Sequence, residues 1–380
     1  MRSKFKIRHI ITAAVNAAAV IGVLVMTAVG SSMAKAQNYN YASDRWRSDS
    51  KDSFSQVSCY LTKDANFTKN NVTNIYYTLM SKLKEASVEP EEGKKLLPYA
   101  YSTYAGKSRV SCDVIGIAEA DITAVGGDFF LFRDFSFISG AYFEDDDNSH
   151  YGAVIDRMLA WKLYGSENIE GKNIYINNVK LYIAGVIETP GTKAEKRCIG
   201  DTPQMFISYD AAEAIFGGAK MDDDFGKSRG YDEVTCFECI TPEPVENFAY
   251  NNIKENLKNT VYKGGFDIVD NRARFTSKTR VKALKKLDKY IVRDDNIVYP
   301  FWENASRIVE VKLSLIYGAR RLLLLIPFIT LAVLAVKGFR LYKRKEKGLK
   351  KAIADGFSVK LSKLRGKFGR KAVQAAKKES

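Results

Sequence analysis

Glu233-Val-Thr-Cys-Phe-Glu-Cys-Ile240 decides the fold, because this strand-like stretch opens a complete unit of strand, helix and strand. Its valine, threonine, phenylalanine and isoleucine are residue types that favour β-structure. Pro242 and Pro244 follow as a turn, and the spacing of apolar residues predicts a helix over Val245 to Leu257. Phe266-Asp-Ile-Val269 is predicted to be the returning strand. The stretch therefore predicts one β-α-β unit.

A second unit of similar size lies nearer the N-terminus. Gln56-Val-Ser-Cys-Tyr-Leu61 is predicted to be a strand, and Thr73 to Ser87 an amphipathic helix. Two such units on either side of a long insertion predict a ferredoxin-like α+β lobe built from both ends of the segment. Its two halves are expected at about residues 55–110 and 230–275.

The insertion, about residues 111–229, has a different pattern, with short strands separated by turn residues. The strands are predicted at Val110 to Ile117, Ala153 to Ile155, Asn173 to Ile176, Lys180 to Ile187 and Gln204 to Ile207. Asn177-Asn178 suits a tight hairpin turn, since asparagine tolerates positive φ. Short helices are predicted at Asp156 to Tyr164 and Asp210 to Phe216, and a basic amphipathic helix at Val281 to Tyr290. The insertion is expected to form a mainly β lobe, and the fold class to be α+β with two lobes.

Two apolar segments, Ile10 to Gly30 and Leu322 to Val336, lie near the ends of the chain, and the excess positive charge is beside them. The first ten residues hold four basic side chains, and Lys337 to Ser380 holds 16 against three acids. Lys and Arg beside apolar spans remain in the cytoplasm. The predicted topology has both termini cytoplasmic: residues 1–9 inside, span 10–33, extracytoplasmic domain 37–312, span 315–338 and basic cytoplasmic tail 339–380.

Three features of these ends leave alternatives. Ala34-Lys35-Ala36 resembles a signal-peptide cleavage site, but the apolar run before it is nearer a bilayer-spanning length, which favours an uncleaved anchor. The second apolar segment is short, so a buried core helix competes with a span. Apolar residues three or four apart in the tail favour a helix lying on the inner leaflet, while its glycines favour a partly disordered tail.

The pI of 9.3 does not indicate nucleic-acid binding, because the middle of the chain is close to neutral. Basic ends beside membrane spans instead favour contact with anionic lipids, and membrane lipids are the first expected partner.

The sequence contains no convincing group of catalytic, cofactor-binding or metal-binding residues. We therefore expect that the protein is not an enzyme and has no cofactor. The two histidines, His9 and His150, lie far apart, and the acidic loop Glu144 to Asp147 lacks the spacing of an EF-hand. No phosphate-binding GxxxxGK[ST] loop occurs. The five cysteines fall in the predicted extracytoplasmic segment, where disulfides can form: Cys59, Cys112, Cys198, Cys236 and Cys239. Cys236 and Cys239 have zinc or redox spacing, but on one strand they would point to opposite faces.

Tyr299-Pro-Phe-Trp-Glu-Asn304 precedes the second apolar segment and contains aromatic residues that favour a bilayer interface. The segment is expected either to pack the extracytoplasmic domain onto the membrane face or to make an ordinary core contact.

An ordered series of short motifs in the insertion resembles one known family. The motifs are Val125-Gly-Gly-Asp-Phe-Phe130, Phe137-Ile-Ser-Gly-Ala-Tyr-Phe143, Ala153-Val-Ile-Asp156, Ala160-Trp-Lys-Leu-Tyr-Gly165, Ile169-Glu-Gly-Lys172, Ile174-Tyr-Ile-Asn177 and Ile183-Ala-Gly-Val-Ile-Glu188. In this order they resemble the MacB-like periplasmic core domain of ABC transporter permeases of the MacB/FtsX type. Tyr164 stands where that family usually has phenylalanine. The resemblance covers about Val110 to Tyr209 and extends to the flanking units.

The resemblance implies a two-lobed extracytoplasmic domain, with a porter-like lobe built from the two β-α-β units and a mainly β lobe formed by the insertion. It also implies that this domain is non-catalytic and relays movement driven by a partner ATPase, or contacts substrate and partner proteins. A permease of this type has three helices after the domain, whereas one is predicted here, so the expectation is a component that acts with an ABC ATPase, a full permease subunit, or both. The alternative expectation is a cell-surface sensing or binding module without an ATPase partner.

Overall fold

The computed structural model describes residues 2–47, 53–90, 94–114, 116–143, 151–217, 231–286 and 296–376. The chain divides into two compact units, one formed by Ala28–Gly318 and the other by Met1–Thr27 with Ala319–Ser380. Every strand in the described residues belongs to the first unit.

The porter-like lobe is a four-stranded antiparallel arrangement with strand order β10-β1-β9-β2. Its strands are β1 (Phe54–Leu61), β2 (Tyr99–Cys112), β9 (Cys236–Pro242) and β10 (Phe266–Asp270). The two β-α-β units interlock, because β9 of the second unit lies between β1 and β2 of the first, and β1 lies between β9 and β10. This interlocking is the split β-α-β arrangement that the two sequence units predict.

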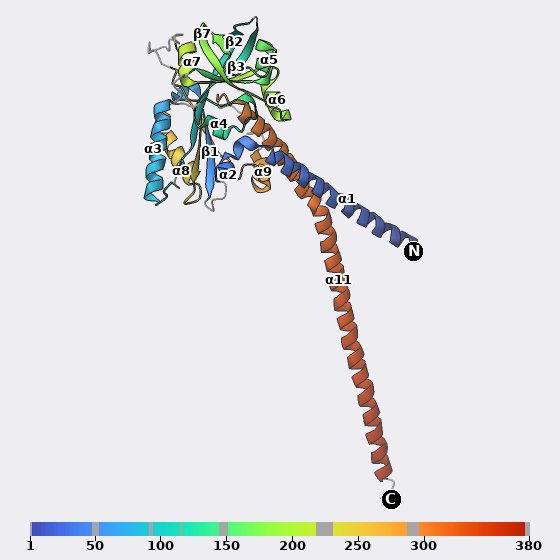
Figure 1. Cartoon of the computed structure of the whole chain (residues 1–380). Helices are drawn as coiled ribbons and strands as arrows, with labels where there is room; N and C mark the ends of the chain where they lie inside the picture. Colours follow the sequence, from blue (N-terminus) through green and yellow to red (C-terminus); the bar gives the residue numbers. More distant parts are fainter. Residues whose placement is uncertain are drawn as a thin grey trace. The chain divides into compact units, whose positions relative to one another are not determined.

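Helices α3 (Lys69–Glu85) and α8 (Phe248–Thr260) pack beside each other on one face of these strands (Figure 1). Thr68 and Asn71 form a reciprocal capping box at the start of α3, which satisfies backbone donors that a helix leaves open. Both helices bury one apolar stripe against the sheet, comprising Val72, Ile75, Leu79 and Leu83 of α3 and Phe248, Ala249, Ile253 and Leu257 of α8.

The second lobe is a closed ring of strands, in which β2 pairs with β3, then β8, β5, β7 and β6 follow, and β6 pairs with β2 again. The added strands are β3 (Ile117–Gly127), β4 (Phe137–Gly140), β5 (Gly152–Asp156), β6 (Asn173–Ile176), β7 (Val179–Ile187) and β8 (Gln204–Ser208). Strand β4 pairs with the end of β7, at Gly185 to Ile187, beyond the residues of β7 that pair with β6. Closing a sheet in this way leaves few exposed edges. Asn177 and Asn178 both have positive φ between β6 and β7, as the predicted hairpin requires.

Short helices connect the strands of this lobe: α4 (Phe129–Phe132), α5 (Arg157–Tyr164), α6 (Lys193–Ile199) and α7 (Tyr209–Phe216). The buried carboxylate of Asp156 accepts a hydrogen bond from the Leu159 amide and so begins α5. Gly165, with left-handed φ, ends the same helix.

One predicted strand is wrong. Val110 to Ile117 is not a single strand, because β2 ends at Cys112 and β3 begins at Ile117 after a turn. Gly116, just before β3, lies so close to the Leu163 carbonyl that a Cβ there would be 2.0 Å from its oxygen. The rest of the long strands β2 and β3 was not predicted.

Other sequence expectations fall partly outside the described residues. The basic helix predicted at Val281 to Tyr290 is present only as the end of α9 (Ser277–Ala283) and the 3-10 turn η3 (Leu284–Lys286). The remainder of that helix, His150 and the acidic loop Glu144 to Asp147 lie outside the described residues.

Two long helices carry the apolar segments of the sequence, α1 (Arg2–Lys35) and α11 (Phe301–Ala376). Each is long and apolar enough to cross a membrane, with mean hydropathy of 2.2 and 2.4 in their most apolar windows. Within the second unit the Asn16 amide donates a hydrogen bond to the Thr330 hydroxyl at 3.1 Å. Short elements follow α1: η1 (Asn38–Asn40), α2 (Ala42–Arg47) and, after β1, η2 (Lys63–Ala65).

Candidate functional site

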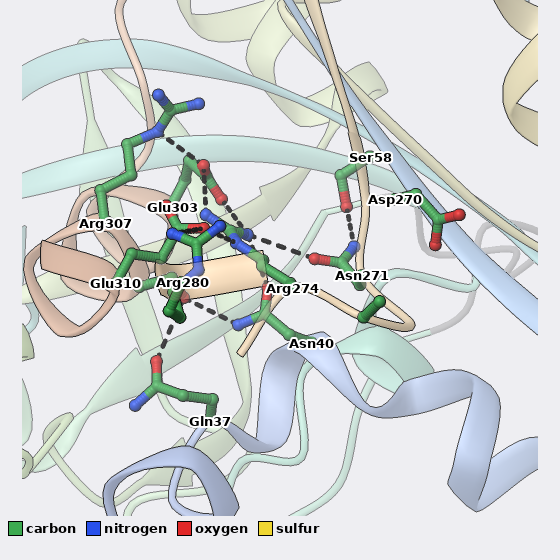
Figure 2. A network of polar contacts seen from close by, with 12 residues as sticks. Gln37, Asn40, Ser58, Asp270, Asn271, Arg274, Arg280, Glu303, Arg307 and Glu310 are labelled. Carbon is green, nitrogen blue, oxygen red and sulfur yellow. Dashed lines mark hydrogen bonds and ion pairs between the residues drawn. The ribbon is translucent and has the colours of Figure 1, made fainter. Parts of the chain in front are cut away.

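A buried ionic cluster, centred on Arg274, lies where the chain leaves β10 and the first turns of α11 pass beside the sheet (Figure 2). Arg274 is 3% exposed, and its two terminal nitrogens donate to the two carboxylate oxygens of Glu303 at 2.8 and 2.7 Å. Its Nε donates to Glu310 at 3.1 Å. Arg274 thus binds two carboxylates that lie two turns apart on α11. We call this cluster the junction.

Two further arginines complete the charge balance of the junction. Arg280 of α9 forms an ion pair with Glu310 at 2.8 Å. Arg307 forms an ion pair with Glu303 at 2.6 Å within the helix and with Asp267 of β10 at 2.8 Å. Three arginines therefore face three carboxylates. Buried charges persist only when they are paired and hydrogen-bonded in this way.

The pKa values of the junction reflect this mutual dependence. Burial raises the pKa of Glu303, and the charge and hydrogen bonds of Arg274 oppose that rise. Burial alone would lower the pKa of Arg274, but Glu303 and Glu310 outweigh it and hold the pKa above its ordinary value. Arg274 is therefore kept charged by its carboxylate partners, and removal of Arg274 leaves those buried carboxylates uncompensated.

The chain that follows α1 joins the same junction. The Asn40 side chain accepts from Arg274 at 3.0 Å and donates to the Ser306 hydroxyl of α11 at 2.7 Å. Ser306 in turn donates to Gln37 at 3.3 Å. These contacts connect the residues after α1 directly to the first turns of α11.

The junction also reaches the centre of the porter-like sheet. Asn271 accepts from Arg274 and donates to the Ser58 hydroxyl of β1, which donates to Glu238 of β9. The Tyr60 hydroxyl of β1 donates to Glu303 at 2.8 Å. Because β1 and β9 are the central strands of this lobe, the junction contacts its most buried part.

Helix α4 of the second lobe packs onto the start of α11. Trp302 is 3% exposed, and its ring lies 5.7 Å from that of Phe129 and 4.4 Å from the Arg133 guanidinium. Arg133 is fully buried and forms an ion pair with Glu238. The membrane-face position for this aromatic segment is thus wrong for Trp302, which makes the core contact that was the alternative. The Asp128-Phe-Phe130 motif that carries the family resemblance provides part of its surroundings.

Apolar contacts secure the end of α1 in the same unit. Met33 and Ala34 pack against a small core that includes Phe275, Leu313 and Tyr317. The last turn of α1 is therefore packed into the unit formed by Ala28–Gly318.

The remaining residues considered in the sequence do not form a site. All five cysteines are free thiols, and Cys236 and Cys239 lie in different cores on opposite faces of β9, as predicted. Among the described residues no group of three or more histidine, cysteine or carboxylate side chains could hold a metal ion. A hollow of about 340 Å³ beside β3 is lined by charges of both signs, including Lys107, Glu119 and Lys162.

The junction residues were missed in the sequence. A signal was present, because Glu303, Arg307 and Glu310 recur three and four residues apart beside apolar residues of the same helix. Their partners Arg274 and Arg280 come from a separate segment, and no spacing rule connects the two.

Residues 10–228, more than half of the chain, match the model of the MacB-like periplasmic core domain. The chain belongs to this family. The MacB-like chain therefore has a membrane-anchored extracytoplasmic domain of the ABC-transporter permease-related type and two helices able to span a membrane.

Individual relatives cover only parts of the MacB-like chain. The Macrolide export ATP-binding/permease protein MacB of Pasteurella multocida (strain Pm70) is 32% identical over 102 residues, which is 26% of this chain and 14% of that protein. The chain therefore spans about one seventh of the length of this relative.

Solved structures similar to the MacB-like chain include two extracytoplasmic domains. The extracellular domain of the noncanonic ABC-type transporter YknZ from Gram-positive bacteria is 12% identical with a TM-score of 0.37, covering 56% of this chain and 99% of that one. The periplasmic region of MacB from Actinobacillus actinomycetemcomitans is 12% identical with a TM-score of 0.38, covering 62% and 92% respectively.

Proposed function

We propose that this chain is a non-catalytic, membrane-anchored component of an ABC transporter-type complex, in which the extracytoplasmic domain relays movement between the membrane and its two lobes. The observation that carries the proposal is the junction. It joins the residues after α1, the first turns of α11 and the central strands of the porter-like lobe through one set of buried ion pairs.

The physical basis is the geometry of buried ion pairs. Such pairs have directional hydrogen bonds and a large cost for separation in a low-dielectric interior, so they resist gradual sliding. A displacement of α11 along or around its axis would therefore move the strands bonded to it, rather than shear past them. Packed interiors convert small displacements into discrete rearrangements in the same way.

The second lobe is connected to this movement by two routes. Strand β2 is common to both lobes, pairing with β9 in one and with β3 and β6 in the other. Helix α4 contacts Trp302 directly at the start of α11. Both routes support a relay from the membrane segments to the closed ring of strands in the second lobe, which we call the barrel.

The test is co-purification of the full-length chain from its native membrane in mild detergent. Recovery of a stoichiometric ATP-binding subunit is the expected result, and a variant with Val20→Lys and Leu24→Lys, which puts two charges in the middle of the apolar segment of α1 and opposes its insertion, is the control for non-specific capture. If the intact chain is recovered without any ATP-binding subunit, the transporter assignment is lost and a binding or sensing module without an ATPase partner replaces it.

A further inference from the structure

Helix α11 does not end with its apolar segment. The helix continues from Lys337 to Ala376, and its described side chains there include four large apolar ones along one face. Phe339, Tyr342, Leu349 and Ile353 are 63%, 66%, 66% and 59% exposed. Their spacing of three, seven and four residues keeps them on one face of an α-helix. We call this face the tail stripe.

Basic residues flank the tail stripe. Between Lys337 and Lys350 the chain has seven lysines and arginines and one acid, Glu346, which pairs with Lys350 at 2.8 Å. An apolar face with basic flanks is complementary to an apolar surface with acidic edges. A second copy of the same helix does not meet this requirement, because it would bring two sets of like charges together.

The bilayer does not reach most of the tail stripe if the helix remains unbroken. An α-helix rises about 1.5 Å per residue, so Leu349 is roughly 20 Å beyond Val336, the last residue of the apolar segment. A head-group layer is about 5–8 Å thick, and a tilt of up to about 40° shortens the distance by only about a quarter. Leu349 and Ile353 therefore lie beyond the head groups, where only water or protein can cover them.

We propose that the tail stripe docks in an apolar, acid-edged groove of a cytoplasmic protein. The proposal rests on the proposed topology, in which this end of α11 is cytoplasmic, and it replaces a position on the inner leaflet. The occupant is a protein that accepts one amphipathic helix, contacting it at Tyr342, Leu349 and Ile353.

The experiment uses site-specific photocrosslinking in cells with the full-length chain. A benzophenone amino acid replaces Tyr342, Leu349 or Ile353 in turn. Arg344 and Gly348, which helical spacing puts on the other side of the helix, are the matched control positions. The expected result is an adduct with the same protein of discrete mass from all three stripe positions and its absence from both controls.

A second variant separates docking from mere proximity. With the probe at Tyr342, the double substitution of Leu349→Glu and Ile353→Glu should abolish the adduct while the amount of membrane-bound chain stays unchanged. Arg344→Glu should leave the adduct in place. Lipid adducts without protein adducts at the stripe positions would overturn the proposal in favour of the inner leaflet, and adducts of twice the chain mass would overturn it in favour of a second copy.

Failure here and failure of the proposed function are distinguishable. An ATP-binding subunit that co-purifies while the stripe positions give only lipid adducts removes the docking proposal alone. A protein adduct that is not an ATP-binding subunit, with none co-purifying, retains the docking surface and removes the transporter assignment.

Discussion

At the scale of single residues, Arg274 is the centre of the junction. It contacts Glu303, Glu310, Asn40 and Asn271 at once. Two of these partners are carboxylates with almost no access to water. A buried charge that loses its partner costs far more than an exposed one. The residue therefore holds together segments that are far apart in the sequence.

Replacement of Arg274 by methionine should lower the free energy of unfolding of the full-length protein by about 3–5 kcal/mol, since it leaves buried carboxylates without their main partner. Arg157→Met is the matched control, because Arg157 also bridges two acids, Glu167 and Glu188, but its side chain is 40% exposed. The control should cost about 1 kcal/mol or less. Denaturant unfolding in detergent measures both, and equal costs would contradict the junction.

Asp156 predicts a specific pH dependence. Burial raises its pKa from 3.8 to about 6, against opposing hydrogen bonds from the Leu159 amide and Thr189. Because the folded-state pKa is the higher one, the stability it provides is fully present below about pH 4 and is lost as the pH rises through about 6. Asp156→Asn retains the cap, so between pH 4 and 7 it should gain up to about 3 kcal/mol relative to the parent. A difference between the two proteins that does not change with pH would refute this.

Sequence reasoning is least effective at this scale. It correctly put Cys236 and Cys239 on opposite faces, because alternation along a strand is a local property. It did not identify the junction, because an arginine after one strand and a glutamate on a distant helix become partners only through the tertiary fold. Trp302 shows the same limit, because a tryptophan side chain suits a membrane interface as well as a protein core, and only the fold shows that this one is buried.

At the scale of elements, local pattern was sufficient for most strands and helices. Strands β1, β5, β6, β7 and β8 and helices α3, α5, α7 and α8 lie within a few residues of their predicted positions. Strands β2 and β3 were not predicted from the sequence, because small and polar residues such as Ala100, Ser102 and Ala124 occupy much of their length. Their pairing is stabilised by long-range contacts rather than by propensity.

Strand β2 contains an irregularity that residue propensities do not predict. Its register with β3 shifts between Tyr104 and Gly106, and Gly106 has φ of +103° with no atom near a Cβ position. Gly106→Ala should therefore cost about 1–2 kcal/mol of stability through backbone strain alone. Gly191→Ala, at a glycine with ordinary φ and open surroundings, should be close to neutral. Thermal unfolding compares them, and a harmless Gly106→Ala would remove the strain argument.

The packing of α1 predicts that its apolar segment is retained. Met33 and Ala34 contribute to a core with Leu313 and Tyr317, so removal of residues 1–36 would leave this core partly uncovered. The intact mass of a C-terminally tagged protein should correspond to a chain that includes the first helix. A mature N-terminus at Gln37 would show that the Ala34-Lys-Ala36 site is cleaved.

At the scale of the whole molecule, one set of buried contacts holds both ends of the extracytoplasmic domain. The ferredoxin-like lobe carries the junction, and the barrel is joined to it through β2 and through the contact of α4 with Trp302. The family and the two-lobed α+β class were predictable from ordered motifs and paired β-α-β units. The closed ring of strands was not, because closure depends on the pairing of β6 with β2.

The central claim is that movement of the membrane segments changes the distance between the two lobes. Distances between spin labels, one on each lobe, test this claim most directly. Labels at Glu170→Cys of the barrel and Tyr262→Cys of the porter-like lobe are both exposed, and Cys198→Ser removes the half-buried native thiol. The distance should be measured in the complex recovered with its ATP-binding subunit, with and without bound nucleotide. The account predicts a different distance distribution in the two states, whereas identical distributions would contradict it.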